Sequence, residues 1–274
     1  METRRMCPHC RAFITTKDRT CPYCNEAVGP RPVERREPGQ IMGGFIPHAR
    51  FTTIIILLLN SALFLATAYF SMSSGRGDMM NIDGQTLIAF GAKVSIAVRH
   101  YGQWWRLVTA GFLHGGLVHI LMNSWVLFDL GAQVEEVYGA HRLVVIYFVS
   151  TIGGFLASTF WSGDLSVGAS AGIFGLIGAM IALGITHPLG AANRGLYVRW
   201  AIYGLLFGLL PMFRTDNAAH VGGLAAGFLT AWLAGVPRYA TRKETFWRAA
   251  SYVCLGLTAV SFFEMYKFFS NAVQ

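Results

Sequence analysis

Charged residues are scarce in this sequence. Asp, Glu, Lys and Arg make up 13% of the 274 residues, whereas soluble domains contain about 25%. Hydrophobic residues make up 54%, the mean hydropathy is +0.45, and long stretches carry no charge. This shortage excludes an ordinary soluble globule, and it predicts an all-α polytopic membrane protein.

Acidic residues are scarcer than basic ones, at 14 against 22, which gives a net charge of +8. An excess of positive charge occurs in nucleic-acid-binding proteins. In a membrane protein it more often reflects Lys and Arg in cytoplasmic loops. We therefore expect the lipid bilayer as a partner, and we expect no nucleic acid.

A signal peptide is also lacking, because no apolar segment precedes residue 50. This favours a prokaryotic cytoplasmic membrane. Residues 1–27 are polar and rich in cysteine, and residues 28–50 form a basic linker rich in Pro and Gly. We expect a six-span core over 51–236, and a cytoplasmic loop with a seventh span over 237–274.

Apolar runs long enough to cross a bilayer predict seven transmembrane helices. The segment 73–112 separates the first two runs, and it is too long for a turn, so we expect it to pack in the membrane interface. The expected spans are 51–72, 113–133, 141–161, 168–186, 197–212, 217–236 and 249–269.

The positive-inside rule orients these spans. If the N-terminus is cytoplasmic, 16 of the 22 Lys and Arg residues fall in cytoplasmic segments. We therefore expect the N-terminus inside and the C-terminus outside.

Strongly polar residues inside spans are costly and commonly mark function. The predicted topology places five of them in the outer third of the membrane: His114, His119, Asn123, Ser170 and His220. His119 and Asn123 are four residues apart, and so share one helix face. Polar residues without a common role would be scattered in depth.

Ser170 lies in Gly168-Ala-Ser-Ala-Gly172, which fits the G-x-S-x-G pattern of nucleophilic serines. The surrounding helix is rich in small residues, as is the span with Gly223-x-x-x-Gly227. Small-x-x-x-small faces let helices approach closely, which would bring a serine within reach of a histidine. Alone, the pattern also fits a packing serine, and the histidines fit structural groups or an ion path.

Four ordered motifs resemble those of the rhomboid intramembrane serine proteases. They cover most of the chain from 50 to 236. The motifs are "GQWWRLVTAGFLHGGLVHILMN" (102–123), "LGAQVEEVYG" (130–139), "GASAGIFGLIGA" (168–179) and "NAAHVGGLAAG" (217–227).

The resemblance implies an intramembrane serine endopeptidase with a catalytic dyad. Ser170 would be the nucleophile and His220 the general base. His119 and Asn123, with the backbone N–H of Ser170, would form the oxyanion hole, and His114 would support the site nearby. The substrates would be transmembrane segments of other membrane proteins. The loop 211–219 resembles the cap of the family, and we expect it to move with the span 197–212 when substrate enters.

Further positions follow from the same resemblance. Phe174 stands where the family often has an aromatic that packs on the catalytic histidine. Trp105 and Arg106 would be structural residues of the first loop, and Glu135 a structural residue near the inner end of the second span. Ala171 stands where the family often has Gly. This difference is small, and we expect the protein to be active despite it.

Four of the five cysteines form two C-x-x-C pairs, Cys7/Cys10 and Cys21/Cys24. Paired knuckles of this kind bring four thiolates to one tetrahedral Zn²⁺ site, and a 27-residue unit needs such a staple to fold. The unit resembles a zinc ribbon with a structural Zn²⁺. It is a purely structural unit or a binding module for a cytoplasmic protein, and alternatively the basic linker after it lies on anionic lipid. Redox dithiols are the alternative.

Two other functions compete with proteolysis. A proteolytically silent relative would bind membrane clients and use the ribbon to recruit a cytoplasmic partner. A small transporter or channel would use His119, Asn123 and His220 as a polar path. Loss of the Ser170 hydroxyl would leave transport intact but abolish cleavage.

Overall fold

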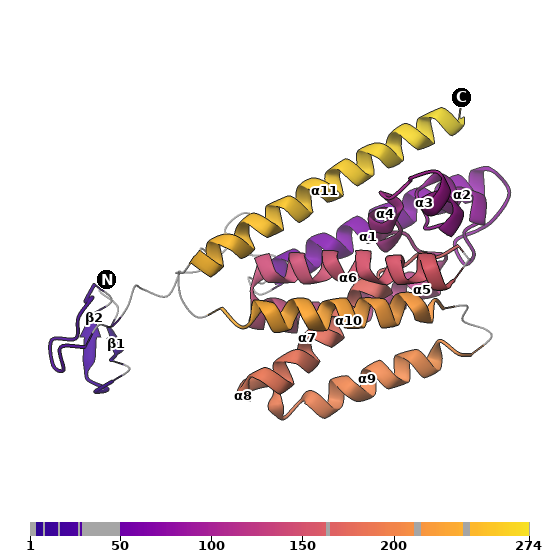
Figure 1. Cartoon of the computed structure of the whole chain (residues 1–274). Helices are drawn as coiled ribbons and strands as arrows, with labels where there is room; N and C mark the ends of the chain where they lie inside the picture. The colour runs from indigo at the N-terminus through magenta and orange to yellow at the C-terminus, as the bar shows by residue number, and fades with distance from the viewer. Residues whose placement is uncertain are drawn as a thin grey trace.

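The computed structural model describes residues 4–7, 9–15, 17–26, 28, 50–162, 165–210, 215–237 and 242–273. The protein has a helical body and a small N-terminal unit of two antiparallel strands (Figure 1). The strands, β1 (Arg4–Met6) and β2 (Phe13–Thr15), pair with Arg5 opposite Ile14. Most of the expected linker, residues 29–49, lies outside the described residues.

The protein is an all-α polytopic membrane protein, and seven long helices form its body. They are α1 (Phe51–Ser73), α5 (Leu117–Tyr138), α6 (Ala140–Trp161), α7 (Ser170–Thr186), α9 (Arg194–Phe207), α10 (Asn217–Ala234) and α11 (Arg242–Val273). Within the described residues, α1, α5, α6 and α11 are long and apolar enough to cross a membrane by length and composition, and α7 is apolar but shorter. A one-turn helix, α8 (Pro188–Ala191), follows α7.

Three helices have limits that differ from those of the expected spans. The second helix begins at Leu117 rather than 113, because the preceding backbone pairs with another segment: Ile82 N–H donates to the Gly115 carbonyl and Leu117 N–H to that of Met79. The fifth helix covers 194–207 rather than 197–212. The seventh begins at 242 rather than 249, because Glu244 in its first turn forms a bidentate ion pair with buried Arg142 of α6.

The segment between α1 and α5 is folded, as expected from its length. It contains α2 (Gly84–Ala89), α3 (Ser95–His100), α4 (Arg106–Thr109) and a 3₁₀ turn, η3 (Ala110–Phe112). Arg106 is buried and donates to the carbonyl oxygens of Ile88 and Ala92. Its guanidinium lies over the rings of both Trp105 and Phe268, which also contact each other, so α11 holds this segment against the body.

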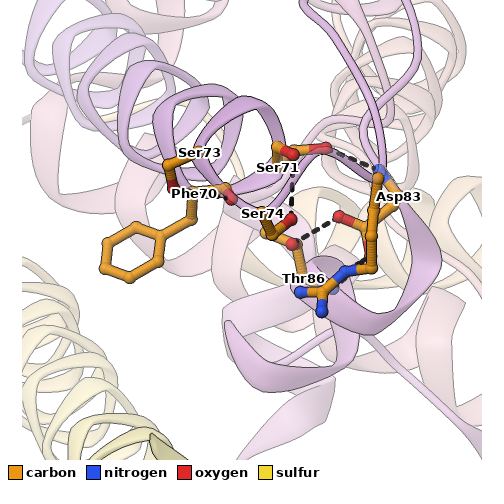
Figure 2. Close-up of polar contacts among 7 residues, drawn as sticks. Phe70, Ser71, Ser73, Ser74, Asp83 and Thr86 are labelled. Carbon is orange, nitrogen blue, oxygen red and sulfur yellow. Dashed lines mark hydrogen bonds and ion pairs between the residues drawn. The ribbon is translucent and has the colours of Figure 1, made fainter.

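The turn after α1 is fixed by polar contacts (Figure 2). Asp83 caps α2 by accepting from Thr86 N–H, and the N–H of Asp83 donates to Ser71 Oγ at the end of α1. Arg76 pairs with the same carboxylate at 3.3 Å. These contacts orient the chain that pairs with residues 115–117, and so they position the start of α5.

The end of the body where α5 ends and α1 begins is also fixed by a buried polar group. Glu135 of α5 accepts hydrogen bonds from the N–H groups of Thr52 and Thr53, which begin α1. A carboxylate at a helix N-terminus accepts hydrogen bonds from the free N–H donors, and its negative charge interacts favourably with the helix dipole. Glu135 is therefore a structural residue, as expected.

Glycines bring α6, α7 and α10 into backbone contact. A Cβ on Gly223 of α10 would overlap the carbonyl oxygen of Ala171, and one on Gly227 would overlap that of Gly175. A Cβ on Gly154 of α6 would lie 2.5 Å from the Ala219 oxygen and 2.7 Å from the Ala171 Cβ. Such contacts are closer than real Cβ atoms tolerate. The small faces seen in the sequence therefore act as helix-packing faces.

Candidate active site

Three helices begin at one end of the body, the end where α2, α3 and α4 lie (Figure 1). Ser170 is the first residue of α7, His220 lies in the first turn of α10, and His119 lies in the first turn of α5. Segments more than 100 residues apart in sequence thus bring their polar side chains to one level of the bundle.

Ser170 and His220 are in hydrogen-bond contact. The Ser170 Oγ lies 3.0 Å from the His220 Nε2, within the range for a nucleophile and its base. The Phe174 ring stacks on the His220 ring, with centroids 4.2 Å apart and an interplanar angle of 9°. His220 is buried. The imidazole therefore has its plane set by Phe174 and its Nε2 edge turned to the serine.

The turn before Ser170 is attached to the first loop. Lys93 and Ser166 exchange two backbone hydrogen bonds, and Gly168 N–H donates to the Ala110 carbonyl. Gly168 has φ of +133°, a region that favours glycine. The glycine before the serine thus makes a turn and does not serve helix packing alone.

His119 faces this turn. A Cβ on Gly168 would lie 2.8 Å from His119 Nε2 and 3.6 Å from Ser170 Oγ, so the imidazole edge and the serine flank the same residue. The Gly115 N–H donates to His119 Nδ1 at 3.4 Å. In a neutral imidazole with an accepting Nδ1, the proton is on Nε2. His119 therefore presents an N–H donor beside the serine.

Asn123 and His114 have buried polar atoms with no hydrogen-bond partner among the described residues. These are Nδ2 of Asn123 and both ring nitrogens of His114. Buried polar groups are normally paired, so a free amide donor near His119 has the chemistry of a ligand-binding group. His114 precedes α5 rather than lying in the helix, and its ring packs edge-to-face on His119 with centroids 5.1 Å apart. The sequence predicted His114 at the outer end of the second span, and the structure places it just before the first residue of α5.

Asp216 caps α10. Its carboxylate accepts from Ala219 N–H at 3.0 Å and from the Ser158 hydroxyl of α6. These bonds use the carboxylate as a helix cap and a tie to α6.

Known proteins resemble the chain over this helical region. The rhomboid domain matches residues 101–237, which is half of the sequence and contains His114, His119, Asn123, Ser170 and His220. This chain belongs to the rhomboid family.

Curated rhomboids from several organisms are similar to the chain. It is 36% identical over 162 residues to rhomboid protease GluP of Bacillus subtilis, covering 56% of this chain and 30% of that protein. It is 32% identical over 193 residues to rhomboid-like protease 2 of Toxoplasma gondii, covering 68% and 66%. RHOMBOID-like protein 5 of Arabidopsis thaliana is 31% identical over 210 residues, with 67% of each chain covered. The chain therefore spans only part of some relatives: it matches 30% of the length of GluP and 54% of the length of RHOMBOID-like protein 7 of Arabidopsis thaliana.

Sequence reasoning about this rhomboid missed Asn217. The Asn217 Oδ1 lies 3.3 Å from His220 Nδ1, and its Nδ2 donates to the Leu205 carbonyl of α9 at 3.1 Å. A spacing of three residues on a helix puts side chains in reach of one another, so the Asn-x-x-His pattern could have predicted the contact between Asn217 and His220. No sequence pattern predicted the contact between Asn217 and α9.

The cysteine unit lies outside the rhomboid match and consists of two equal knuckles. In each knuckle, the N–H of the first cysteine donates to the carbonyl of the residue five positions later. The carbonyl of the same cysteine accepts from the N–H of the residue four positions later. That fourth residue, Arg11 or Asn25, has positive φ. A repeated turn of this kind places two thiols from each knuckle on one side.

The four thiols lie close enough to hold a metal ion. All four Sγ atoms are within 4.8 Å of one another, with Cys7 and Cys24 3.7 Å apart and Cys10 and Cys21 3.6 Å apart. Tetrahedral zinc with bonds of about 2.3 Å requires sulfur atoms about 3.8 Å apart. A backbone hydrogen bond from Cys10 helps to lower the pKa of the Cys7 thiol to about 6, whereas burial and hydrogen bonds with the neighbouring thiols raise the pKa of Cys24 to about 12. The residues fit a metal.

Proposed function

We propose that this rhomboid is an intramembrane serine endopeptidase that cleaves transmembrane segments of other membrane proteins, with Ser170 as nucleophile and His220 as general base. The 3.0 Å contact between Ser170 Oγ and His220 Nε2 carries the proposal. The relatives named as proteases support it. Asp216 serves as a helix cap, so we assign no carboxylate to the dyad.

The reaction follows the acyl-transfer route of serine hydrolases. Ser170 Oγ attacks the peptide carbonyl carbon and its proton passes to His220 Nε2. The carbon–nitrogen bond then breaks, and the amine leaves with that proton. Water attacks the acyl group, gives a proton to His220, and the acid leaves as Ser170 regains its proton.

The developing oxyanion needs donors that are already in place, each contributing about 10²–10³ in rate. The Nε2–H of His119 and the Nδ2 of Asn123 are donors on one face of α5, and the Asn123 Nδ2 is buried with no partner among the described residues. With the backbone N–H of Ser170, they are our candidates for the oxyanion hole. His114 packs on His119 and would hold its ring.

The proposed substrate is a helix whose backbone groups are satisfied internally, so it must unwind at the scissile bond to reach Ser170. Segments with helix-destabilising residues are therefore the expected class. Entry is expected to move α9 and the loop after it, of which residues 211–214 lie outside the described residues. The proposed topology keeps the N-terminus in the cytoplasm and the C-terminus outside, in a prokaryotic cytoplasmic membrane.

For the N-terminal unit we propose a structural Zn²⁺ held by Cys7, Cys10, Cys21 and Cys24, since four thiolates at this spacing suit zinc. The unit would bind a cytoplasmic protein. Metal analysis of the purified protein tests the first point, with Cys21→Ser and Cys24→Ser expected to lose the ion.

Labelling with a fluorophosphonate in detergent tests the dyad. The serine oxygen displaces fluoride from phosphorus, and a base must take the serine proton. Wild type is expected to label, Ser170→Ala to give none, and His220→Ala to lose at least about 10²-fold in rate. Ser261→Ala is the matched control, because this buried hydroxyl bonds only to its own helix at Leu257.

Cleavage of a single-span test protein in vesicles completes the test. Folded wild-type protein that neither labels nor cleaves would contradict the proposal and favour a silent client-binding rhomboid. Ion or solute flux that survives Ser170→Ala would favour a transporter.

A further inference from the structure

The orientation of the Asn217 amide is fixed by its neighbours. Its Nδ2 donates to the Leu205 carbonyl, an oxygen that can only accept. The opposite flip would place two oxygens against each other, so the amide nitrogen faces α9. The amide oxygen therefore faces His220 Nδ1 at 3.3 Å.

This orientation determines which nitrogen of His220 carries the proton. An amide oxygen is only an acceptor, so Nδ1 must be the donor. In the neutral ring, Nε2 then has the lone pair, and Nε2 is the atom 3.0 Å from Ser170 Oγ. The chain of contacts runs from the Leu205 carbonyl through Asn217 and His220 to the serine, and each link has one possible direction.

The last turn of α9 and the residue that follows it, Gly208, contact Phe174 and Asn217, the two residues that support His220. A Cβ on Gly204 would lie 2.7 Å from Cζ of Phe174, the ring stacked on His220. A Cβ on Gly208 would lie 3.0 Å from Cγ of Asn217 and overlap its amide oxygen. Both glycines let α9 approach closely. The position of α9 therefore acts on both groups that orient the imidazole.

We propose that Asn217 is a positioning residue that keeps the proton of His220 on Nδ1, and that the last turn of α9 sets the orientation of Asn217. The inference rests on the proposed dyad of Ser170 and His220. It ties the competence of the base to the position of α9, the helix expected to move when substrate enters.

Two substitutions at Asn217 separate positioning from packing. Asn217→Ala removes the acceptor, and fluorophosphonate labelling is expected to slow by about 10- to 100-fold. Asn217→Asp keeps an acceptor for Nδ1–H but has no donor for Leu205, and labelling is expected to stay within about fivefold of wild type. Thr230→Val is the control, because it removes a hydroxyl of α10 that bonds to Ala226 three turns away.

Thermal unfolding of each variant in detergent accompanies the labelling. Equal rates for wild type and Asn217→Ala contradict the inference. Equal losses for the alanine and aspartate variants, at unchanged stability, indicate a packing role and also contradict it. Wild-type protein that does not label refutes the proposed function instead, so the two failures are distinguishable.

A double-mutant cycle tests the link to α9. Gly208→Ala should displace the Asn217 amide and slow labelling several-fold. In the Asn217→Ala background there is no amide to displace, and Gly208→Ala should slow labelling less than in wild type, through its remaining contact with the Thr215 hydroxyl alone. Gly195→Ala is the matched control, because a Cβ at this other glycine of α9 meets nothing within 4 Å. Independent losses from Gly208→Ala in both backgrounds overturn the role of α9.

Discussion

A single methyl group on Gly154 is expected to separate the two residues of the proposed dyad. Gly154 lies on α6, where α7 and α10 meet. Its added Cβ would be 2.5 Å from the Ala219 carbonyl oxygen and 2.7 Å from the Ala171 Cβ. Ala171 follows Ser170 and Ala219 precedes His220, so the methyl group would act on both helices beside the dyad.

The size of the displacement follows from contact distances. Carbon and oxygen approach to about 3.3 Å and two carbons to about 3.5 Å, so the helices must yield by about 0.8 Å. A backbone oxygen cannot rotate away. The 3.0 Å contact between Ser170 and His220 would then lengthen past about 3.6 Å, where a hydrogen bond is lost. A misplacement of about 1 Å can lower the rate about 10²-fold.

Stability should change much less than activity. Alanine stabilises a helix by about 1 kcal/mol relative to glycine, and overpacking costs about 1–3 kcal/mol. The two effects largely offset each other. Gly154→Ala is therefore expected to unfold within a few degrees of wild type in detergent, while fluorophosphonate labelling slows about 10²-fold. Gly256→Ala is the control, because its Cβ meets nothing within 4 Å. Labelling of Gly154→Ala within twofold of wild type would refute the packing argument.

Three further changes have defined outcomes. Phe268→Ala removes one ring beside the buried guanidinium of Arg106 and should lower the free energy of unfolding by about 1–2 kcal/mol, measured by thermal unfolding; an unchanged midpoint would contradict a bracing role for α11. Glu135→Ala leaves the N–H groups that begin α1 without their acceptor and should cost about 2–3 kcal/mol, with Glu135→Gln intermediate; equal stability of both variants would be the contrary result. Metal chelation should expose the cysteine unit to protease while Ser170 labelling stays constant, and a parallel loss of labelling would show that the unit and the site are coupled.

The sequence determined much of the fold because the bilayer is a simple solvent. A helix must satisfy its own backbone groups there, so length and hydropathy indicate a span, and all seven long helices were expected. The errors lie at the ends. Nothing local marks the start of α5 at Leu117, because the preceding residues are taken up by backbone pairing with Met79 and Ile82.

The sequence also indicated which side chains meet. Ordered motifs and a common depth singled out Ser170, His220 and His119, and the structure places them at one end of the bundle. The close approach was readable as well, because glycine faces have one physical use between helices. The repeated C-x-x-C spacing likewise predicted that the four thiols lie close together, since two identical turns present their thiols on one side.

Only the tertiary structure decided the orientation of the histidine. Asn217 is an ordinary helix-start residue until the Leu205 carbonyl of α9 is placed beside its amide. Hydrogen-bond direction depends on a partner that no local pattern encodes, and α9 comes from a different part of the chain. The amino-acid sequence supplied the chemical groups and the closeness of the helices. The fold decided the flip of one amide, and with it which nitrogen of His220 carries the proton.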